Sequence, residues 1–325
     1  MRLSHTYFYH PEYAENNESV IQHFEKQGIS MQKIQNALGR KNRFIVPGES
    51  EETSLSMGIE AAKGVLGESK ISISDIDIIV FVSNTPEHQI PCDAIQIHYA
   101  LEGKPETLCY DINANCIGGF IALDQVSRYL ASSESAQKAL IICAEKMSRV
   151  LDPQNPITAF CLSDSSFAFI IEDNGNAASG LIDVLYHTDS SFCNTVLYPP
   201  NGHSCHNLQD KAPWDRIFDG MGSVDFALDH ISNFLKRNHT TIEQIDLFLF
   251  SQFSIKNINI IMESLHLPAK KVPFYSEELG YTGASSPFLA LHQYQKKVNR
   301  LQKGDSVLIW TLGTGYQAGL MLWKY

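Results

Sequence analysis

Apolar residues in this chain alternate between helical spacing and short continuous runs. Residues 51–67 carry apolar side chains on one helix face, behind acidic residues suited to a helix start: Leu55, Ile59, Ala62 and Val65. Residues 76–82 form a β-branched run, IDIIVFV, which is typical of a strand covered on both faces. The same patterns predict further helices over 117–131, 224–236, 255–266 and 283–296, and further strands over 138–144, 167–171, 245–250 and 306–311. This alternation predicts a layered α/β fold.

One local pattern occurs twice along the chain. Residues 72–81 and 241–250 each read as a capping hydroxyl, a short loop, Ile-Asp and then a strand. Either two unrelated loop-to-strand joins or a duplicated α/β unit would explain the repeat. Residues 173–180, DNGNAASG, are the stretch richest in Gly and Asn. A duplication therefore predicts two halves, 1–175 and 176–325.

Composition and charge exclude several classes of protein. The 325 residues include 25 Lys plus Arg against 36 Asp plus Glu, a net charge of −11. An acidic chain without a basic block does not fit a nucleic-acid-binding protein. We find no apolar run long enough to span a bilayer and no signal-peptide pattern at the N-terminus, so we expect no membrane association and a cytoplasmic location. The seven cysteines form no CxxC pair, so we expect neither a disulfide framework nor a metal site.

Cys116 differs from the other cysteines in its position. A strand-like segment, 108–112, precedes it and the predicted helix 117–131 follows, so Cys116 lies at a strand-to-helix turn. Free backbone N–H groups and the helix dipole favour a thiolate there. Gly118 and Gly119 follow, and because glycine in a helix costs about 1 kcal/mol relative to alanine, we expect them to admit a ligand. The alternative is a buried structural cysteine at a tight helix start.

The segment Asp111-x-x-x-x-Cys116-x-Gly118, followed by Ala122-Leu123, resembles the nucleophile elbow of the β-ketoacyl-ACP synthase III branch of the thiolase superfamily. Other segments resemble further family motifs in the family's order, at residues 38–45, 83–101, 163–166, 218–220, 280–285 and 313–316. The resemblance implies a thiolase-like, five-layered αβαβα fold built from two duplicated halves. It also implies a homodimer, with a heterodimer of related synthases as the alternative.

The resemblance implies acyl-transfer chemistry at Cys116. This thiol would take an acyl group from an acyl-ACP or acyl-CoA thioester, with no permanently bound cofactor. The backbone N–H groups of Cys116 and Thr314 would form the oxyanion hole, Thr314 replacing a usual glycine. Ile90, in the loop from Pro86 to Pro91, would reach the partner's acyl pocket.

Two positions depart from the family pattern. Ser251 stands where the family has its catalytic histidine, and Tyr281 where it has its catalytic asparagine. In the family this pair stabilises the enolate formed when a malonyl thioester loses CO₂, and neither replacement carries an imidazole. We therefore expect an acyltransferase or condensing enzyme of a specialised secondary-metabolite or lipid-like pathway. The alternatives are a classical decarboxylative 3-oxoacyl-ACP synthase with a rebuilt site, in which His88 could substitute, and a non-catalytic subunit of a heterodimeric ketosynthase.

The donor site also departs from the family. The family clamps the CoA adenine with a Trp and an Arg, whereas residues 31–38 contain neither. A carrier-protein-bound donor is therefore favoured over CoA. Carrier proteins are acidic, so docking needs a local basic patch. We expect this patch among four cations: Lys256, Arg40, Lys41 and Arg43.

Overall fold

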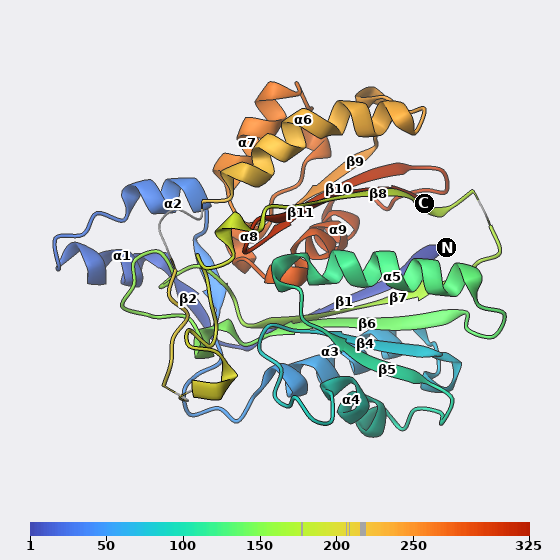
Figure 1. Ribbon diagram of the computed structural model, residues 1–325, viewed down its shortest axis with the longest axis horizontal. Coiled ribbons are helices and arrows are strands. Elements are labelled where there is room, and N and C mark those ends of the chain that lie inside the picture. The colour runs from blue at the N-terminus through green and yellow to red at the C-terminus, as the bar shows by residue number, and fades with distance from the viewer. Residues whose placement is uncertain (177, 206, 208, 215–218) are drawn as a thin grey trace.

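The computed structural model describes residues 1–176, 178–205, 207, 209–214 and 219–325 (Figure 1). The strands are β1 (Arg2–Tyr9), β2 (Ala14–Asn16), β3 (Asn42–Phe44), β4 (Ile78–Val82), β5 (Leu108–Ile112), β6 (Lys138–Glu145), β7 (Ser165–Glu172), β8 (Gly180–Thr188), β9 (Leu247–Phe250), β10 (Ser306–Gly313) and β11 (Gln317–Lys324). The α-helices are α1 (Asn17–Glu25), α2 (Gln32–Leu38), α3 (Ser54–Ser69), α4 (Asp93–Leu101), α5 (Gly118–Ser132), α6 (Met221–Arg237), α7 (Ile255–Ser264), α8 (Ser276–Leu279) and α9 (Ser286–Lys297).

The first sheet has the strand order β1-β7-β6-β4-β5, with β4 parallel to both of its neighbours. All five residues of β4 are buried, because helices cover both faces of the sheet. Ile79 and Phe81 point into the core beneath α3 and α4, whereas Val80 and Val82 point toward α5. The continuous apolar run in the sequence therefore reflects burial on two faces.

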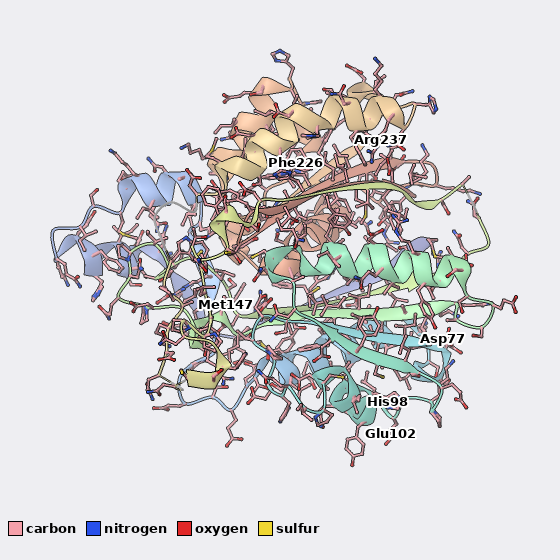
Figure 2. The ribbon with its side chains drawn as sticks, viewed as in Figure 1. Asp77, His98, Glu102, Met147, Phe226 and Arg237 are labelled. Carbon is pink, nitrogen blue, oxygen red and sulfur yellow. The ribbon has the colours of Figure 1, made fainter. Side chains whose placement is uncertain are left out.

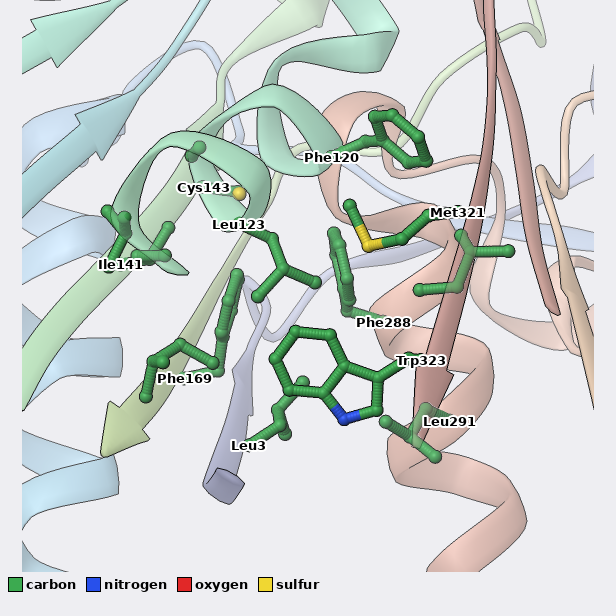
Figure 3. Close-up of a cluster of buried hydrophobic side chains, with 14 of the residues drawn as sticks. Leu3, Phe120, Leu123, Ile141, Cys143, Phe169, Phe288, Leu291, Met321 and Trp323 are labelled. Atoms are coloured by element: carbon green, nitrogen blue, oxygen red, sulfur yellow. The ribbon is translucent and has the colours of Figure 1, made fainter. Parts of the chain in front are cut away.

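The second sheet has the order β8-β11-β10-β9, with β9 parallel to β10. Leu308 and Trp310 of β10 face the core beneath α6 and α7, and Val307 and Ile309 face the opposite core. That opposite core fills the space between the two sheets, where α5 and α9 lie (Figure 1). Its members come from distant parts of the chain, as Figure 3 shows for Phe120, Leu123, Phe288, Met321 and Trp323.

The layers thus run α3/α4, first sheet, α5/α9, second sheet, α6/α7 (Figure 1). This arrangement confirms the predicted five-layered αβαβα fold. Each predicted helix and strand overlaps an element of the expected type, although the helix predicted from residue 283 opens with a 3₁₀ turn, η8 (Gly283–Ser285), before α9. Among the described residues, no helix combines the length and the apolar character needed to cross a membrane.

The two repeated joins have matching geometry. Ser72 precedes the 3₁₀ turn η1 (Ile73–Asp75) before β4, and Thr241 precedes η6 (Ile242–Gln244) before β9. In each, an aspartate carboxylate accepts the first backbone N–H of the neighbouring parallel strand: Asp77 Oδ2 from Lys138 at 3.0 Å and Asp246 Oδ2 from Ser306 at 2.8 Å. Figure 2 shows Asp77 at this end of the first sheet. A division at residues 175 and 176 leaves each sheet within one half, and it stays a prediction.

Candidate active site

Cys116 lies in the 3₁₀ turn η2 (Asn115–Ile117), between the end of β5 and the start of α5. Asn115 turns the chain with φ at 53°, in the left-handed region that asparagine tolerates better than most residues. Its side-chain amide donates to the carbonyl of Thr314 at 3.5 Å. The turn thus ties the cysteine of one half to a loop of the other half.

Gly118 and Gly119 serve packing, so our expectation that they admit a ligand is wrong. Both are buried. A Cβ on Gly118 would lie 2.6 Å from Val82 Cγ1, and a Cβ on Gly119 would lie 2.5 Å from the carbonyl oxygen of Ala284. The glycines let the start of α5 pack closely against β4 and η8, and this packing fixes the position of the turn that carries Cys116.

The loop between β10 and β11 lies against the same turn. A Cβ on Gly313 would lie 3.3 Å from Ile117 Cγ2. Gly315 and Tyr316 hold the left-handed conformations of this loop, at φ 76° and 49°, and Thr314 has no positive φ. Threonine therefore fits in place of the usual glycine. The part of the Thr314 N–H in an oxyanion hole stays a prediction.

Ser251 and Tyr281 meet beside Cys116 in the interior. Ser251 follows β9 and Tyr281 follows α8, and each is 1% exposed. Their hydroxyl oxygens are 3.4 Å apart. The Tyr281 hydroxyl also lies close enough to the Cys116 thiol to lower the pKa of that thiol. The structure thus brings the three predicted site side chains into one contact chain.

Burial raises the pKa of the Cys116 thiol to about 12, and the hydrogen bond with Tyr281 lowers it. Desolvation by burial therefore outweighs the predicted thiolate-favouring effect of the turn on the Cys116 pKa. Burial also holds the pKa of Tyr281 well above its ordinary value. Tyr281 consequently remains a hydroxyl donor across the physiological range, and Cys116 is mostly a thiol until a substrate arrives.

Two family models match this chain. The one described as 3-oxoacyl-[acyl-carrier-protein (ACP)] synthase III matches residues 110–190, and the one for its C-terminal part matches residues 235–325. Together they span more than half of the chain. The chain belongs to the 3-oxoacyl-ACP synthase III family. Members of this family are condensing enzymes of the ketosynthase III type, which is the broad class expected from Cys116 and its surroundings.

Individual relatives agree with this assignment. The β-ketoacyl-ACP synthase III of Ehrlichia ruminantium (strain Gardel) is 27% identical over 288 residues, which cover 87% of each chain. The Aquifex aeolicus enzyme is 27% identical over 312 residues, covering 95% of this chain and 96% of its own. A crystal structure of 3-oxoacyl-ACP synthase III from Aquifex aeolicus has a TM-score of 0.85 at 25% identity, over 99% of this chain and 98% of its own. OleA of Xanthomonas campestris, at 16% identity, TM-score 0.84 and 99% and 97% coverage, shares the fold.

The structure corrects two of the four docking cations. Arg40 is 2% exposed and donates to the carbonyls of Cys161 and Phe253, so it cannot contact a carrier at the surface. Arg43 is 9% exposed and forms an ion pair with Glu15 at 2.6 Å. The Arg43 charge is therefore paired within the protein and is not offered to a carrier at the surface.

The other two docking cations remain candidates. Lys41 is exposed and pairs with Glu277 at 2.6 Å. Lys256 is exposed at the start of α7 and lines a cleft of about 510 Å³. A role for Lys41 and Lys256 in docking a carrier protein stays a prediction.

That cleft leads toward the site. Its wall is mainly apolar and includes Ile34, Trp214 and Met221, and its inner end reaches Cys161 and Phe253. The Phe253 ring packs edge-on against Tyr281 at 5.5 Å. Substrate entering the cleft would therefore approach the residues that surround Cys116.

The loop carrying Ile90 lies on the surface, and Ile90 is 91% exposed. In the same loop, His88 Nδ1 binds Asp93 Oδ1 at 2.9 Å. His88, the candidate substitute for the family's catalytic histidine, is thus paired with Asp93. Among the described residues, no group of three or more His, Cys, Asp and Glu side chains could hold a metal ion. The family motif at 218–220 begins at Phe218, which lies outside the described residues.

Sequence reasoning missed Glu145, at the end of β6. It is 1% exposed, and burial raises its pKa to about 8 while hydrogen bonds from Asn84 and Thr85 lower it. The Asn84 side chain donates to Oε1 at 2.9 Å and its backbone N–H donates to Oε2 at 3.0 Å. A Cβ on Gly283 would lie 3.8 Å from Oε1, so the carboxyl group sits where the two halves meet. A lone acidic residue ending an apolar strand is the signal that could have marked it.

Proposed function

We propose that this chain forms an acyl-enzyme at Cys116 and passes the acyl group to an acceptor in a specialised pathway. The observation that carries the proposal is the placement of the Cys116 thiol at the β5–α5 turn, where it interacts with the Tyr281 hydroxyl and where Asn115 of the same turn donates to the Thr314 carbonyl. A thiol, a backbone donor and a side-chain donor in one buried site are the groups needed to attack a thioester.

In the acylation step, the Cys116 sulfur attacks the thioester carbonyl carbon and the carbon–sulfur bond to the carrier breaks. The leaving carrier sulfur takes up the proton that Cys116 loses, so charge and atoms balance. The N–H groups of Cys116 and Thr314 would hold the carbonyl oxygen while it bears negative charge. In the second step the acceptor attacks the acyl carbon, the bond from that carbon to the Cys116 sulfur breaks, and the sulfur takes up the proton that the acceptor loses.

The residues beside the thiol support acyl transfer more than decarboxylation. Ser251 and Tyr281 each offer one hydroxyl, and neither side chain can take up a positive charge near neutral pH. Loss of CO₂ from a malonyl thioester leaves an enolate oxygen that needs strong donors. We infer that the acceptor is a hydroxyl, an amine or an already activated carbon nucleophile.

A carrier-protein thioester is the favoured donor. The cleft, of about 510 Å³ and with a mainly apolar wall, suits a pantetheine arm, and exposed Lys33 and Lys256 line it. Two lysines at such an opening suit the phosphate of the arm and the acidic surface of a carrier protein. Acyl-CoA carries the same arm and is the second donor to test.

Intact-protein mass spectrometry tests the proposal directly. We expect incubation with acyl-ACP, and more weakly with acyl-CoA, to add one acyl mass that maps to Cys116. Cys116→Ala should abolish the adduct completely. Cys161→Ala is the matched control, because Cys161 is buried at the inner end of the same cleft and should leave the adduct in place.

Two results would contradict the proposal. An adduct that persists in Cys116→Ala would place the nucleophile elsewhere. Failure of all acyl donors to modify the folded protein would favour the non-catalytic subunit of a heterodimer.

We further propose that the chain forms a homodimer through the exposed edge of the first sheet. Large apolar side chains are exposed on α4, on the edge strand β5 and in the loop before α4: Ile95, Tyr99, Leu108 and Ile90. A partner that covers them would receive Ile90 in its acyl pocket. Light scattering at micromolar concentration should give the mass of a dimer, and Ile90→Trp should shorten the accepted acyl chain; a monomer removes the premise.

A further inference from the structure

Arg40 is a buried cation beside the Tyr281 ring. It follows Gly39, which ends α2 in the left-handed conformation at φ 70°. The backbone packs closely against α7 here, because a Cβ on Gly39 would lie 2.5 Å from Ile255 Cγ2. The Arg40 backbone carbonyl accepts from the Asn17 side chain at 2.6 Å. The backbone is thus fixed, and the side chain runs inward, where only 2% of the residue remains exposed.

The charge of Arg40 has no anionic partner among the described residues. Its two terminal nitrogens donate to the carbonyls of Cys161 and Phe253, and its Nε has no hydrogen-bond partner there. Burial lowers the pKa of the guanidinium, which starts high enough to stay protonated near neutral pH. An unpaired buried cation costs folding free energy. We therefore expect the buried Arg40 charge to have a functional role that offsets this folding cost.

The Cys161 thiol and two aromatic rings surround the Arg40 charge. The guanidinium carbon lies 5.3 Å from the centroid of the Tyr281 ring and 6.0 Å from that of Phe253. A cation over a phenol ring withdraws electron density and makes the hydroxyl a stronger hydrogen-bond donor. The Tyr281 hydroxyl is the group that hydrogen-bonds with Cys116 and lies 3.4 Å from Ser251 Oγ.

We propose that Arg40 is a positioning residue that acts through Tyr281, strengthening its hydroxyl as a donor to the sulfur and to the thioester oxygen at Cys116. In the family resemblance, a histidine and an asparagine occupy the places of Ser251 and Tyr281. Arg40 restores, on the far side of the Tyr281 ring, a positive charge that this pair lacks. The inference rests on the proposed function in taking Cys116 as the nucleophile.

The test is a double-mutant cycle read by alkylation of Cys116. Iodoacetamide modifies the thiolate and needs no acyl donor, and peptide mass spectrometry separates Cys116 from the other cysteines. At fixed pH, Arg40→Met should slow modification of Cys116 roughly tenfold and displace its pH profile toward higher pH. In a Tyr281→Phe background the same change should have less than about a twofold effect, because the ring remains and the hydroxyl is gone.

Further variants separate the charge from a structural role. Arg40→Lys, which keeps the charge, should stay within about threefold of the unmodified protein, whereas Arg40→Gln should behave like Arg40→Met. Arg40→Gln replaces Arg40→Met if the latter fails to fold. Arg237→Met is the matched control: Arg237 stacks on Phe234 at 4.7 Å at the end of α6, far from the site (Figure 2), and its loss should leave the alkylation rate unchanged.

Either of two results would overturn the inference. Equal losses in Arg40→Lys and Arg40→Gln would show that shape matters and charge does not. A full loss on removing Arg40 in the Tyr281→Phe background would show that Arg40 acts on the sulfur without Tyr281. If the alkylation cycle comes out as expected while no acyl donor modifies Cys116, the proposed function fails and the coupling of Arg40 to Tyr281 stands.

Discussion

The two halves of the chain contribute to the site in different ways. The first half supplies the β5–α5 turn, whose shape depends on the backbone and on the absence of side chains at Gly118 and Gly119. The second half supplies side chains, Ser251 and Tyr281, from loops after β9 and α8. By the resemblance noted in the sequence, we expect the first contribution to match the family and the second to depart from it. A step that needs only backbone geometry can thus persist while a step that needs particular side chains is lost.

The largest effect on stability and acylation should come from a substitution at the β5–α5 turn of the first half. Gly119→Ala places a methyl group 2.5 Å from the Ala284 carbonyl, so we expect a loss of about 3 kcal/mol or more in the free energy of unfolding, together with loss of Cys116 acylation. Urea titration measures the first and mass spectrometry the second. Gly67→Ala in α3, where nothing lies within 4 Å, is the control and should be neutral or stabilising. Equal effects of the two changes would refute the packing role.

Glu145, where the halves meet, should give the protein a pH-dependent stability. Its pKa, about 8 in the fold, lies above that of an unfolded glutamate. The folded state therefore keeps a proton that the unfolded state releases, so this contribution is full at low pH and is lost as pH rises toward 8. From pH 5 to pH 7 the loss should be about 2 to 3 kcal/mol.

Urea titration at pH 5, 6 and 7 measures the Glu145 contribution. Glu145→Gln should flatten the fall in unfolding free energy, because the amide of glutamine does not titrate. An unchanged slope in this variant would assign the pH dependence to other groups.

The smallest effects should separate the two side chains of the second half. Tyr281→Phe removes the hydroxyl that contacts Cys116 and should slow acylation roughly tenfold. Ser251→Ala removes a hydroxyl that lies 3.4 Å from the Tyr281 oxygen, and it should slow acylation no more than about twofold. Stopped acylation reactions analysed by mass spectrometry give both rates. A larger loss in Ser251→Ala would make Ser251 the direct partner of the thiol.

Several central strands could be predicted because they are buried on both faces, although the central strand β11 was missed. Residues 76–82 read as a continuous apolar run for this reason, and β4 lies within them. The outer strands β1 and β8 were missed because most of their residues are only partly buried, which leaves no clear run or alternation. The 3₁₀ start before α9 was missed because η8 differs from an α-helix in hydrogen bonding and not in composition.

The site could be predicted only where a residue's role follows from its place in the chain. The turn at Cys116 shows in sequence because a strand and a helix flank it. The burial of Arg40 does not, because arginine is usually exposed and the fit of Gly39 against Ile255 joins segments more than two hundred residues apart. The packing role of Gly118 and Gly119 was hidden for the same reason, since Val82 and Ala284 are distant in sequence.

The central claim is that the chain keeps acylation and has lost efficient decarboxylation. The most direct measurement compares labelled CO₂ release from a malonyl thioester with the rate of Cys116 acylation in the unmodified protein. Because removal of one preorganised oxyanion donor costs about a hundred- to thousand-fold in rate, we predict release at least about a hundredfold slower than acylation. Ser251→His combined with Tyr281→Asn should raise it. Release at a rate comparable with acylation would contradict the account and make the chain a classical decarboxylative synthase with a rebuilt site.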